Sequence, residues 1–191
     1  MNARTALLIM DVQVGIVQRF ADDNAYLERL ASAIGAARAA GIRIIFVRVA
    51  FRTGLPEVSP KNKSFSAIAQ AVESRFGEGD TFTQIHPAVA PVDGDVVVTK
   101  RRVSAFSGSD LDVVLRAGEI DTLVLAGIST SGVVLSTTRE AADRDFRLVV
   151  LSDGCLDADT EVHRVLTEKV FPRQAEVMAV ADWVATAASD S

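Results

Sequence analysis

The chain has few residues that could cross-link it or gather a metal ion. Cys155 is its only cysteine, which excludes an internal disulfide and fits a reducing cytosol. The two histidines, His86 and His163, lie far apart in the sequence, so a histidine-rich zinc cluster is not expected. The apolar runs, such as TLVLAGI, are far too short to cross a bilayer. These absences favour a soluble protein that neither spans a membrane nor depends on zinc.

An excess of basic residues is also absent. Lysine and arginine together number 20 against 25 aspartate and glutamate residues, and the net charge of −5 argues against binding to nucleic acid. The 191 residues are 49% hydrophobic, which is enough for the core of one globular domain spanning residues 1–191. The first residues, MNARTALLIM, lead directly into an apolar run without a signal peptide, so we expect a cytoplasmic protein.

Strand-like and helix-like segments alternate along the chain. Strands are predicted at residues 5–12, 42–51, 95–100, 121–127, 147–154 and 175–180. One helix is predicted after Gly127, and others are predicted at residues 25–41, 110–118, 159–170 and 181–188. Residues 52–94 hold glycine, proline and serine around a weak helical patch, which indicates an excursion over the end of the sheet. The alternation predicts an α/β fold whose mostly parallel sheet is covered by helices on both faces.

Polar residues end several of these apolar strands. Asp11 closes the first strand, Lys100 closes the third, and Gly127 is followed by the short turn STSGV. Ligands of parallel sheets bind outside the carboxyl ends of the strands, so we expect these residues to gather there. A buried carboxylate and a buried lysine offset one another when they pair. A purely structural ion pair explains Asp11 and Lys100 equally well at this point.

Four segments at these strand ends are similar to the signature blocks of the isochorismatase-like hydrolases. They are ALLIMDVQ, VVVTKRRVSAFSGSDLD, LVLAGISTSGVVLSTTREAADRDF and VVLSDGCLDADTEVH. The resemblance covers nearly the whole chain in order, and the family includes nicotinamidases, carbamoyl- and ureido-amide hydrolases and isochorismatase itself. It implies a three-layer α/β/α fold with six mostly parallel strands in the order 3-2-1-4-5-6. It also implies a small-molecule substrate and a homo-oligomer, a dimer or larger.

The resemblance implies roles for single residues as well. The family's general acid/base aspartate falls on Asp11 and its lysine on Lys100, and its non-proline cis peptide falls on Ile128–Ser129. The backbone amides of Ser129 and Val133 are implied as an oxyanion hole. The cysteine nucleophile of the amidase members also falls on Val133, and a valine side chain can neither attack nor donate. Isochorismatase proper lacks that cysteine too, because it hydrolyses a vinyl ether by proton delivery from a carboxyl group.

Other candidate nucleophiles and bases have simpler explanations. The resemblance makes Cys155 a position often occupied by a second, non-catalytic cysteine, and small buried cysteines are commonly packing residues. Thr130 and Ser131 are expected to cap the helix that begins there. His86 and His163 are expected at the surface or in packing contacts.

Residues close to the strand ends are candidates for substrate contact. Gln13 and Arg19 follow Asp11 in a loop where family members place such contacts, and Phe51 and Phe106 could shape the pocket. The family's metal-binding nicotinamidases carry an Asp/His set after the second strand, where this sequence has VRVAFRTG. No metal and no cofactor are therefore expected.

Three hypotheses stay open from the sequence. The first is a hydrolase that acts on a small metabolite by acid–base chemistry of Asp11 and Lys100, without a cysteine nucleophile. The second is an amidase with an unorthodox nucleophile. The third is a catalytically silent family member that binds a small molecule or a protein partner. Retention of Asp11 and Lys100 favours the first over the third, because an unused buried pair has no evident reason to remain.

Overall fold

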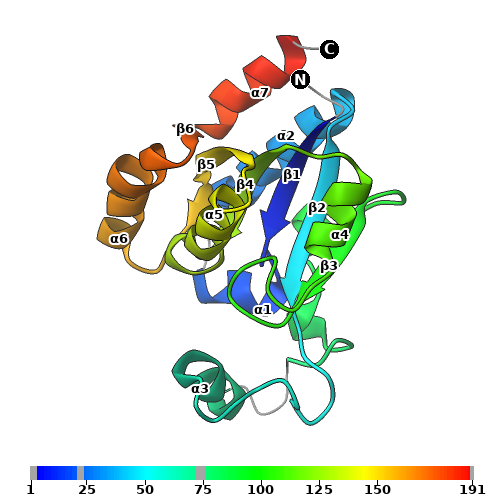
Figure 1. Cartoon of the computed structure of the whole chain (residues 1–191), viewed down its shortest axis with the longest axis vertical. Helices are drawn as coiled ribbons and strands as arrows, with labels where there is room; N and C mark the ends of the chain where they lie inside the picture. Colours follow the sequence, from blue (N-terminus) through cyan, green and yellow to red (C-terminus); the bar gives the residue numbers. More distant parts are fainter. Residues whose placement is uncertain (1–3, 21–23, 72–75, 190–191) are drawn as a thin grey trace.

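A parallel sheet forms the middle layer of the computed structural model, which describes residues 4–20, 24–71 and 76–189. The sheet has six strands in the order β3-β2-β1-β4-β5-β6, and every paired neighbour runs parallel (Figure 1). The strands are β1 (Thr5–Met10), β2 (Arg43–Val49), β3 (Val96–Lys100), β4 (Thr122–Ile128), β5 (Arg147–Leu156) and β6 (Glu176–Met178). The predicted fold class and strand order are therefore confirmed.

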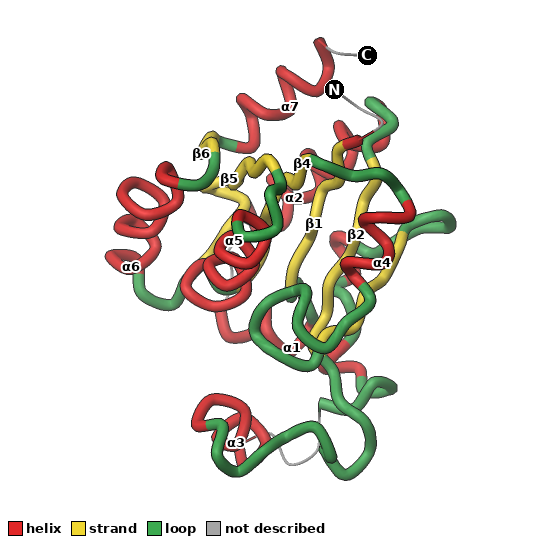
Figure 2. Tube along the Cα trace, viewed as in Figure 1, coloured by secondary structure: helices red, strands yellow, loops and turns green. Residues whose placement is uncertain are grey.

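Helices cover both faces of this sheet (Figures 1 and 2). The α-helices are α1 (Val14–Val17), α2 (Asn24–Ala39), α3 (Lys63–Ala71), α4 (Leu111–Ala117), α5 (Leu135–Ala142), α6 (Thr160–Val165) and α7 (Val180–Ser189). Shorter helical segments are η2 (Gln18–Phe20), η3 (Thr81–Thr83), η4 (Pro87–Val89), η5 (Thr130–Val134), η6 (Leu166–Val170) and η7 (Phe171–Arg173). The predicted helix 159–170 is divided, because α6 gives way to the π-helical η6. Within the described part of the chain, no helix combines the length and the apolar character needed to span a bilayer.

The central strand β1 is buried along its whole length, because the helices of both layers pack against it. Ala6, Leu8 and Met10 belong to a core that also contains residues of α4 and α5, whereas Leu7 and Ile9 belong to a core with α2 and α7. Successive side chains of a strand point to opposite faces, so a strand between two helical layers needs an unbroken apolar run. The segment TALLIM meets this requirement.

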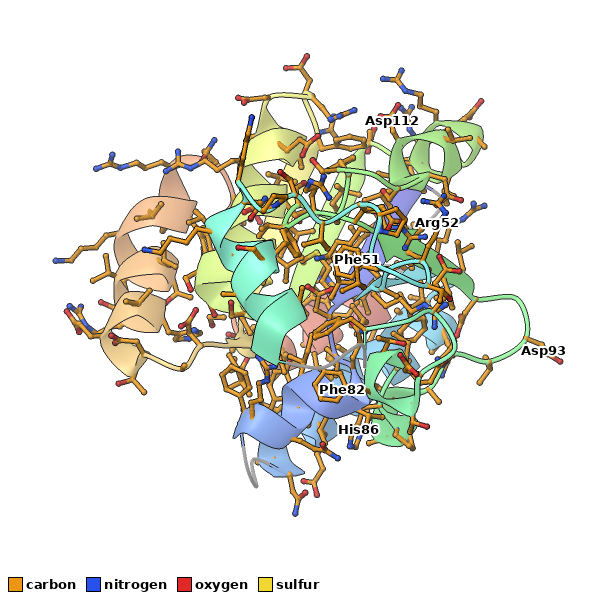
Figure 3. The ribbon with its side chains drawn as sticks, turned by 90° about the horizontal axis from the view of Figure 1, so that it is seen from below. Phe51, Arg52, Phe82, His86, Asp93 and Asp112 are labelled. Carbon is orange, nitrogen blue, oxygen red and sulfur yellow. The ribbon has the colours of Figure 1, made fainter. Side chains whose placement is uncertain are left out.

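The excursion between β2 and β3 lies at the carboxyl ends of the strands, as predicted. Helix α3 stands apart from the sheet at this end of the molecule (Figures 1 and 2). Phe51, Phe65 and Phe76 form a separate apolar cluster against which Phe82 packs. Their ring centroids lie 5.2 to 6.3 Å apart in tilted and edge-to-face contacts. Seen from this end, Phe51 and Phe82 lie near the centre of the view (Figure 3). The excursion therefore has its own small aromatic core.

Gly127 lies in β4 directly beside the backbone of Met10 in β1. Its φ is +149°, and a side-chain carbon built on it would meet the carbonyl oxygen of Met10 at 2.1 Å. The Gly127→Ala substitution is therefore expected to lower the free energy of unfolding by about 3 kcal/mol or more, because backbone atoms would have to move apart. Urea denaturation followed by circular dichroism measures this loss.

Gly35→Ala is the matched control for this prediction. Gly35 is exposed in α2, and apart from its chain neighbours and the backbone of its own helix, no atom lies within 4 Å of the position that its side-chain carbon would take. Alanine is the better helix former, so this variant is expected to gain about 0.5–1 kcal/mol of stability. Similar stabilities for the two variants would contradict the close approach at Gly127.

Candidate active site

A cavity of about 460 Å³ opens at the carboxyl ends of β1, β3 and β4, and residues of the excursion form part of its wall. The lining side chains with a charge or a hydroxyl are Asp11, Arg19, Lys100, Ser129, Ser131 and Asp157. The apolar part of the wall includes Ile16, Phe20, Phe65, Phe76 and Val133. A cavity of this size and composition suits a small molecule. Among the described residues, no three His, Cys, Asp or Glu side chains are grouped to hold a metal ion, and the absence of a metal stays a prediction.

Asp11 and Lys100 form a buried ion pair in this wall. Lys100 Nζ lies 2.9 Å from Asp11 Oδ2, and the two side chains are only 2% and 8% exposed. The same Nζ also donates to the carbonyl oxygen of Arg102 at 2.9 Å. The Asp11 N–H donates to the carbonyl of Val47 at 2.8 Å, with a φ of +57° that aspartate tolerates better than most residues. The pair therefore links the ends of β1 and β3 across β2.

The second carboxylate oxygen of Asp11, Oδ1, is buried and has no hydrogen-bond partner among the described residues. Burial raises the pKa of Asp11 above its usual 3.8, and the Lys100 ammonium offsets only part of this rise. A carboxyl group in this setting can hold a proton and deliver it to a molecule in the cavity. This is the chemistry of a general acid.

The turn after β4 forms another side of the cavity. The peptide bond Ile128–Ser129 is cis, which confirms the expectation from the resemblance. The chain then enters the π-helical η5, a geometry that is frequent at functional sites, before α5 begins. Ser129 and Val133 both line the cavity, and Val133 is only 2% exposed. The structure therefore brings the predicted turn to the same cavity as Asp11 and Lys100.

The backbone of this turn folds back on itself. The amides of Gly132 and Val134 both donate to the carbonyl of Ser129 at 3.2 Å. The amides of Ser129 and Val133 take no part in these two bonds, which is compatible with the oxyanion hole that the resemblance implies. That role stays a prediction.

Two contacts of the turn were not expected from the sequence. The Thr130 hydroxyl and His163 Nδ1 lie 2.8 Å apart, and the amide of Ser131 donates to Asp157 Oδ2 at 2.7 Å. The expectation that Thr130 caps the helix is wrong, because its hydroxyl contacts α6 instead. These partners are 33 and 26 residues apart, so no local signal pairs them. Asp157 is thereby a cavity residue that the sequence pattern did not identify.

Comparison with known proteins identifies the family. The isochorismatase domain model matches residues 5–182. The chain belongs to the isochorismatase family. An isochorismatase family protein of Escherichia coli O157:H7, YecD, is 33% identical over 186 residues, which cover 94% of this chain and 95% of that protein. Ureidoacrylate amidohydrolase RutB of Methylorubrum extorquens is 35% identical over 138 residues, 67% of this chain and 56% of that enzyme. The solved structure of an isochorismatase family protein from Burkholderia thailandensis has a TM-score of 0.84 at 29% identity and covers 98% and 97% of the two chains.

In this member of the isochorismatase family, Cys155 lies away from the cavity wall. It pairs with Gly127 in the sheet and is buried. Burial raises the pKa of its thiol to about 12, a hydrogen bond with the Gly127 backbone offsets part of the rise, and the charge of Asp153 adds to it. A thiol that stays protonated is a poor nucleophile.

Of the residues expected to contact a substrate, Arg19 lines the cavity and Gln13 does not. The Gln13 side chain is fully buried. Its Nε2 donates to the carbonyls of Val49 and Thr83 at 2.9 and 2.8 Å, and its Oε1 accepts from the Val49 amide at 2.8 Å. Gln13 therefore joins the end of β2 to the excursion, and these bonds occupy the groups that a substrate would need.

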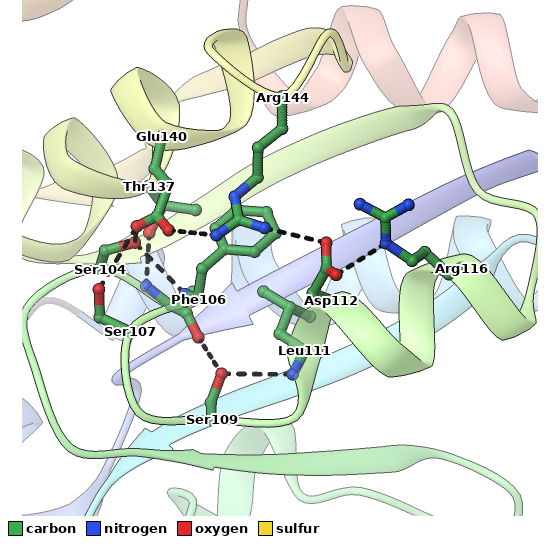
Figure 4. Close-up of polar contacts among 11 residues, drawn as sticks. Ser104, Phe106, Ser107, Ser109, Leu111, Asp112, Arg116, Thr137, Glu140 and Arg144 are labelled. Carbon is green, nitrogen blue, oxygen red and sulfur yellow. Dashed lines mark hydrogen bonds and ion pairs between the residues drawn. The ribbon is translucent and has the colours of Figure 1, made fainter.

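Phe51 and Phe106 are also outside the cavity wall. Phe51 packs edge-to-face on Phe65, which lines the cavity together with Phe76 of the same aromatic cluster. The ring centroids of Phe106 and Phe146 lie 6.1 Å apart. The Arg144 guanidinium carbon lies 4.6 Å from the centroid of the Phe106 ring (Figure 4). Both rings pack against other side chains and do not face the cavity.

A hydrogen-bond network fixes the loop after Lys100 to helix α5 (Figure 4). Thr137 Oγ1 accepts from the amide of Ala105 at 3.0 Å, and Glu140 Oε2 accepts from the Ser104 hydroxyl at 2.5 Å. Thr137 is fully buried, so this amide has no access to water as an alternative partner. The network holds the β3 loop and the helix that follows the Val133 turn in one arrangement.

The native protein is expected to resist alkylation by iodoacetamide. With a pKa of about 12, only about one Cys155 thiol in 10⁴ is ionised at pH 8.

A Val133→Cys variant, which adds no volume, should instead react at residue 133 faster than at Cys155, because residue 133 lines the cavity. Peptide mass spectrometry over time measures both rates. Rapid alkylation of Cys155 in folded native protein would show that the thiol is not buried.

Thr137→Val is expected to lower the free energy of unfolding by about 1–3 kcal/mol, because the buried Ala105 amide loses its acceptor. Urea denaturation measures the change. Thr186→Val is the control, since that hydroxyl is exposed on α7, and it should shift stability by less than about 0.5 kcal/mol. Equal effects at the two positions would contradict the importance of the network.

Proposed function

We propose that this member of the isochorismatase family hydrolyses a small molecule by acid catalysis from Asp11, assisted by Lys100 and without a covalent intermediate. The observation that carries the proposal is the buried, unpartnered Oδ1 of Asp11, a residue of the cavity wall. A proton on this oxygen would be offered to a bound substrate and to no protein acceptor among the described residues. Val133 stands where covalent amide hydrolysis would need a cysteine.

In the proposed reaction, the Asp11 proton moves to the carbon of an acid-labile double bond or to the leaving atom of the substrate. The carboxylate that results lies 2.9 Å from Lys100 Nζ, whose positive charge stabilises it. A water molecule then adds to the cationic centre of the substrate and returns one proton to Asp11. In the vinyl ether case, the resulting hemiketal breaks its bond to the leaving oxygen, which takes up the hydroxyl proton as the carbonyl forms. One substrate bond is broken at the expense of one water molecule, and no electron acceptor is needed. Hydrolysis of a vinyl ether is the reaction class that fits best.

An amidase with another nucleophile has less support. RutB is an amidohydrolase by name, but Cys155 of this chain lies outside the cavity wall. Ser129 and Ser131 do line the cavity. In the described part of the chain, neither hydroxyl is hydrogen-bonded to a histidine or carboxylate that could take its proton, which an activated serine requires.

A catalytically silent member would keep the cavity and bind a ligand without turnover. Activity measurements therefore separate it from the proposed hydrolase. The cytoplasmic location and the homo-oligomeric state expected from the sequence stay predictions.

Asp11→Asn is expected to reduce hydrolysis by about a hundredfold or more, because the amide cannot deliver the proton. The rate of the native protein should fall as the pH rises through the pKa of Asp11, which burial places above 3.8, since only the protonated form acts as the acid. Both are measured as rate against pH on a panel of vinyl ethers and small amides. Full activity of the variant would overturn the proposal.

Stability measurements show whether the variant probes the intended group. A raised pKa means that the contribution of Asp11 to stability is present below pH 3.8 and is lost as the pH rises through the pKa of the folded state. In Asp11→Asn, the free energy of unfolding should not show this decrease as the pH rises. Asp93→Asn is the control, because Asp93 is exposed on a loop at the edge of the molecule (Figure 3), and it should change neither profile.

A further inference from the structure

Arg19 lines the cavity and has no acidic partner in the part of the chain that the structure describes. The other charged side chains of the wall are engaged: Asp11 and Lys100 pair at 2.9 Å, and Asp157 accepts from the amide of Ser131 at 2.7 Å. Arg19 lies in η2, in the segment that follows Asp11, and its side chain makes no ion pair among the described residues. Its positive charge is therefore not neutralised by the described part of the protein.

A ring contact orients Arg19 without cancelling its charge. The guanidinium carbon lies 5.9 Å from the centroid of Phe82, and Phe82 packs against Phe76 of the cavity wall with centroids 5.2 Å apart. A guanidinium that rests on a ring keeps its N–H donors at the edge, where they can bind a planar anion. Arg102 is the contrasting case, because it also stacks on a ring but donates to the carbonyl of Arg101 at 2.6 Å.

The other residues of the cavity wall indicate which further features a fitting ligand must have. Phe20, Phe65 and Phe76 contribute apolar surface between the charged groups, so a ligand that fits has an apolar body. With Asp11 protonated, as the proposed reaction requires, the described wall residues include two cations, Arg19 and Lys100, and one anion, Asp157, which would repel a second anionic group. The cavity therefore favours a ligand with one negative charge.

We propose that Arg19 binds the carboxylate of the substrate, whose apolar body extends along the cavity wall toward Asp11. This inference rests on the proposed function, because Asp11 marks the end at which the bond breaks. One guanidinium matches one planar carboxylate through two parallel N–H···O bonds. A phosphate dianion would bring a second negative charge into a wall that already holds the Asp157 carboxylate, so the site selects small apolar carboxylic acids.

Binding of matched probes to the full-length protein tests this assignment. The probes are two carboxylates, benzoate and phenylacetate, and their neutral amides, benzamide and phenylacetamide, titrated by isothermal calorimetry. Each carboxylate should bind the native protein about tenfold or more tightly than its amide, as expected for a charge-assisted pair. Arg19→Gln should remove that difference and leave amide affinity unchanged, whereas Arg19→Lys should keep part of it. Arg147→Gln, at an exposed position where β5 begins, should leave all affinities as in the native protein.

Three results would overturn the assignment: amides that bind as tightly as carboxylates, no binding of either carboxylate up to about 10 mM, or carboxylate binding that survives Arg19→Gln but is lost in Lys100→Met. The same titrations in Asp11→Asn separate this inference from the proposed reaction. Carboxylate selectivity that persists in Asp11→Asn while hydrolysis is also retained supports Arg19 as the binding residue and counts against acid catalysis by Asp11 alone. Selectivity that persists while hydrolysis is lost supports both assignments.

Discussion

The buried ion pair between Asp11 and Lys100 joins the site to the sheet. Strands β1 and β3 are not neighbours, because β2 lies between them, with Met10 paired to Val47 and Val49 paired to Lys100. The two charges can meet at 2.9 Å only when all three strands are in place. Loss of one partner from such a pair leaves a buried charge, which typically costs about 3–5 kcal/mol. The fold and the candidate acid therefore stabilise one another at this edge.

The cavity beside the pair depends on close approach between distant segments. Gly127 lets β4 come against the backbone of Met10, and the turn that begins two residues later brings Ser129 and Val133 into the wall. The aromatic cluster of the excursion between β2 and β3 supplies Phe65 to the same wall. No single segment encloses a volume, so the site exists only in the assembled fold.

Val133 fits the scaffold of the family without the side chain that covalent attack would need. The side chain packs in the same core as the residues of α4 and α5, so valine satisfies the packing requirement at this position. The backbone of the turn and the cis peptide do not depend on a thiol. In the proposed function, valine at this position excludes covalent attack by residue 133 and leaves Asp11 as an acid beside the Lys100 cation. Function therefore has to be argued from the site, since relatives with the same fold need not share the reaction.

The sequence by itself determined the strands, most helix bounds and, through the family resemblance, the positions of Asp11, Lys100 and the turn at Val133. Apolar periodicity and glycine stops act between neighbours in the chain, so they can be read without a structure. Only the tertiary structure decided that the Gln13 side chain is hydrogen-bonded to backbone groups and that Thr130 contacts α6. It also decided that Arg19 reaches the cavity with no ion pair among the described residues. These outcomes depend on which side chains from distant segments meet, and the same local pattern is compatible with several such partners.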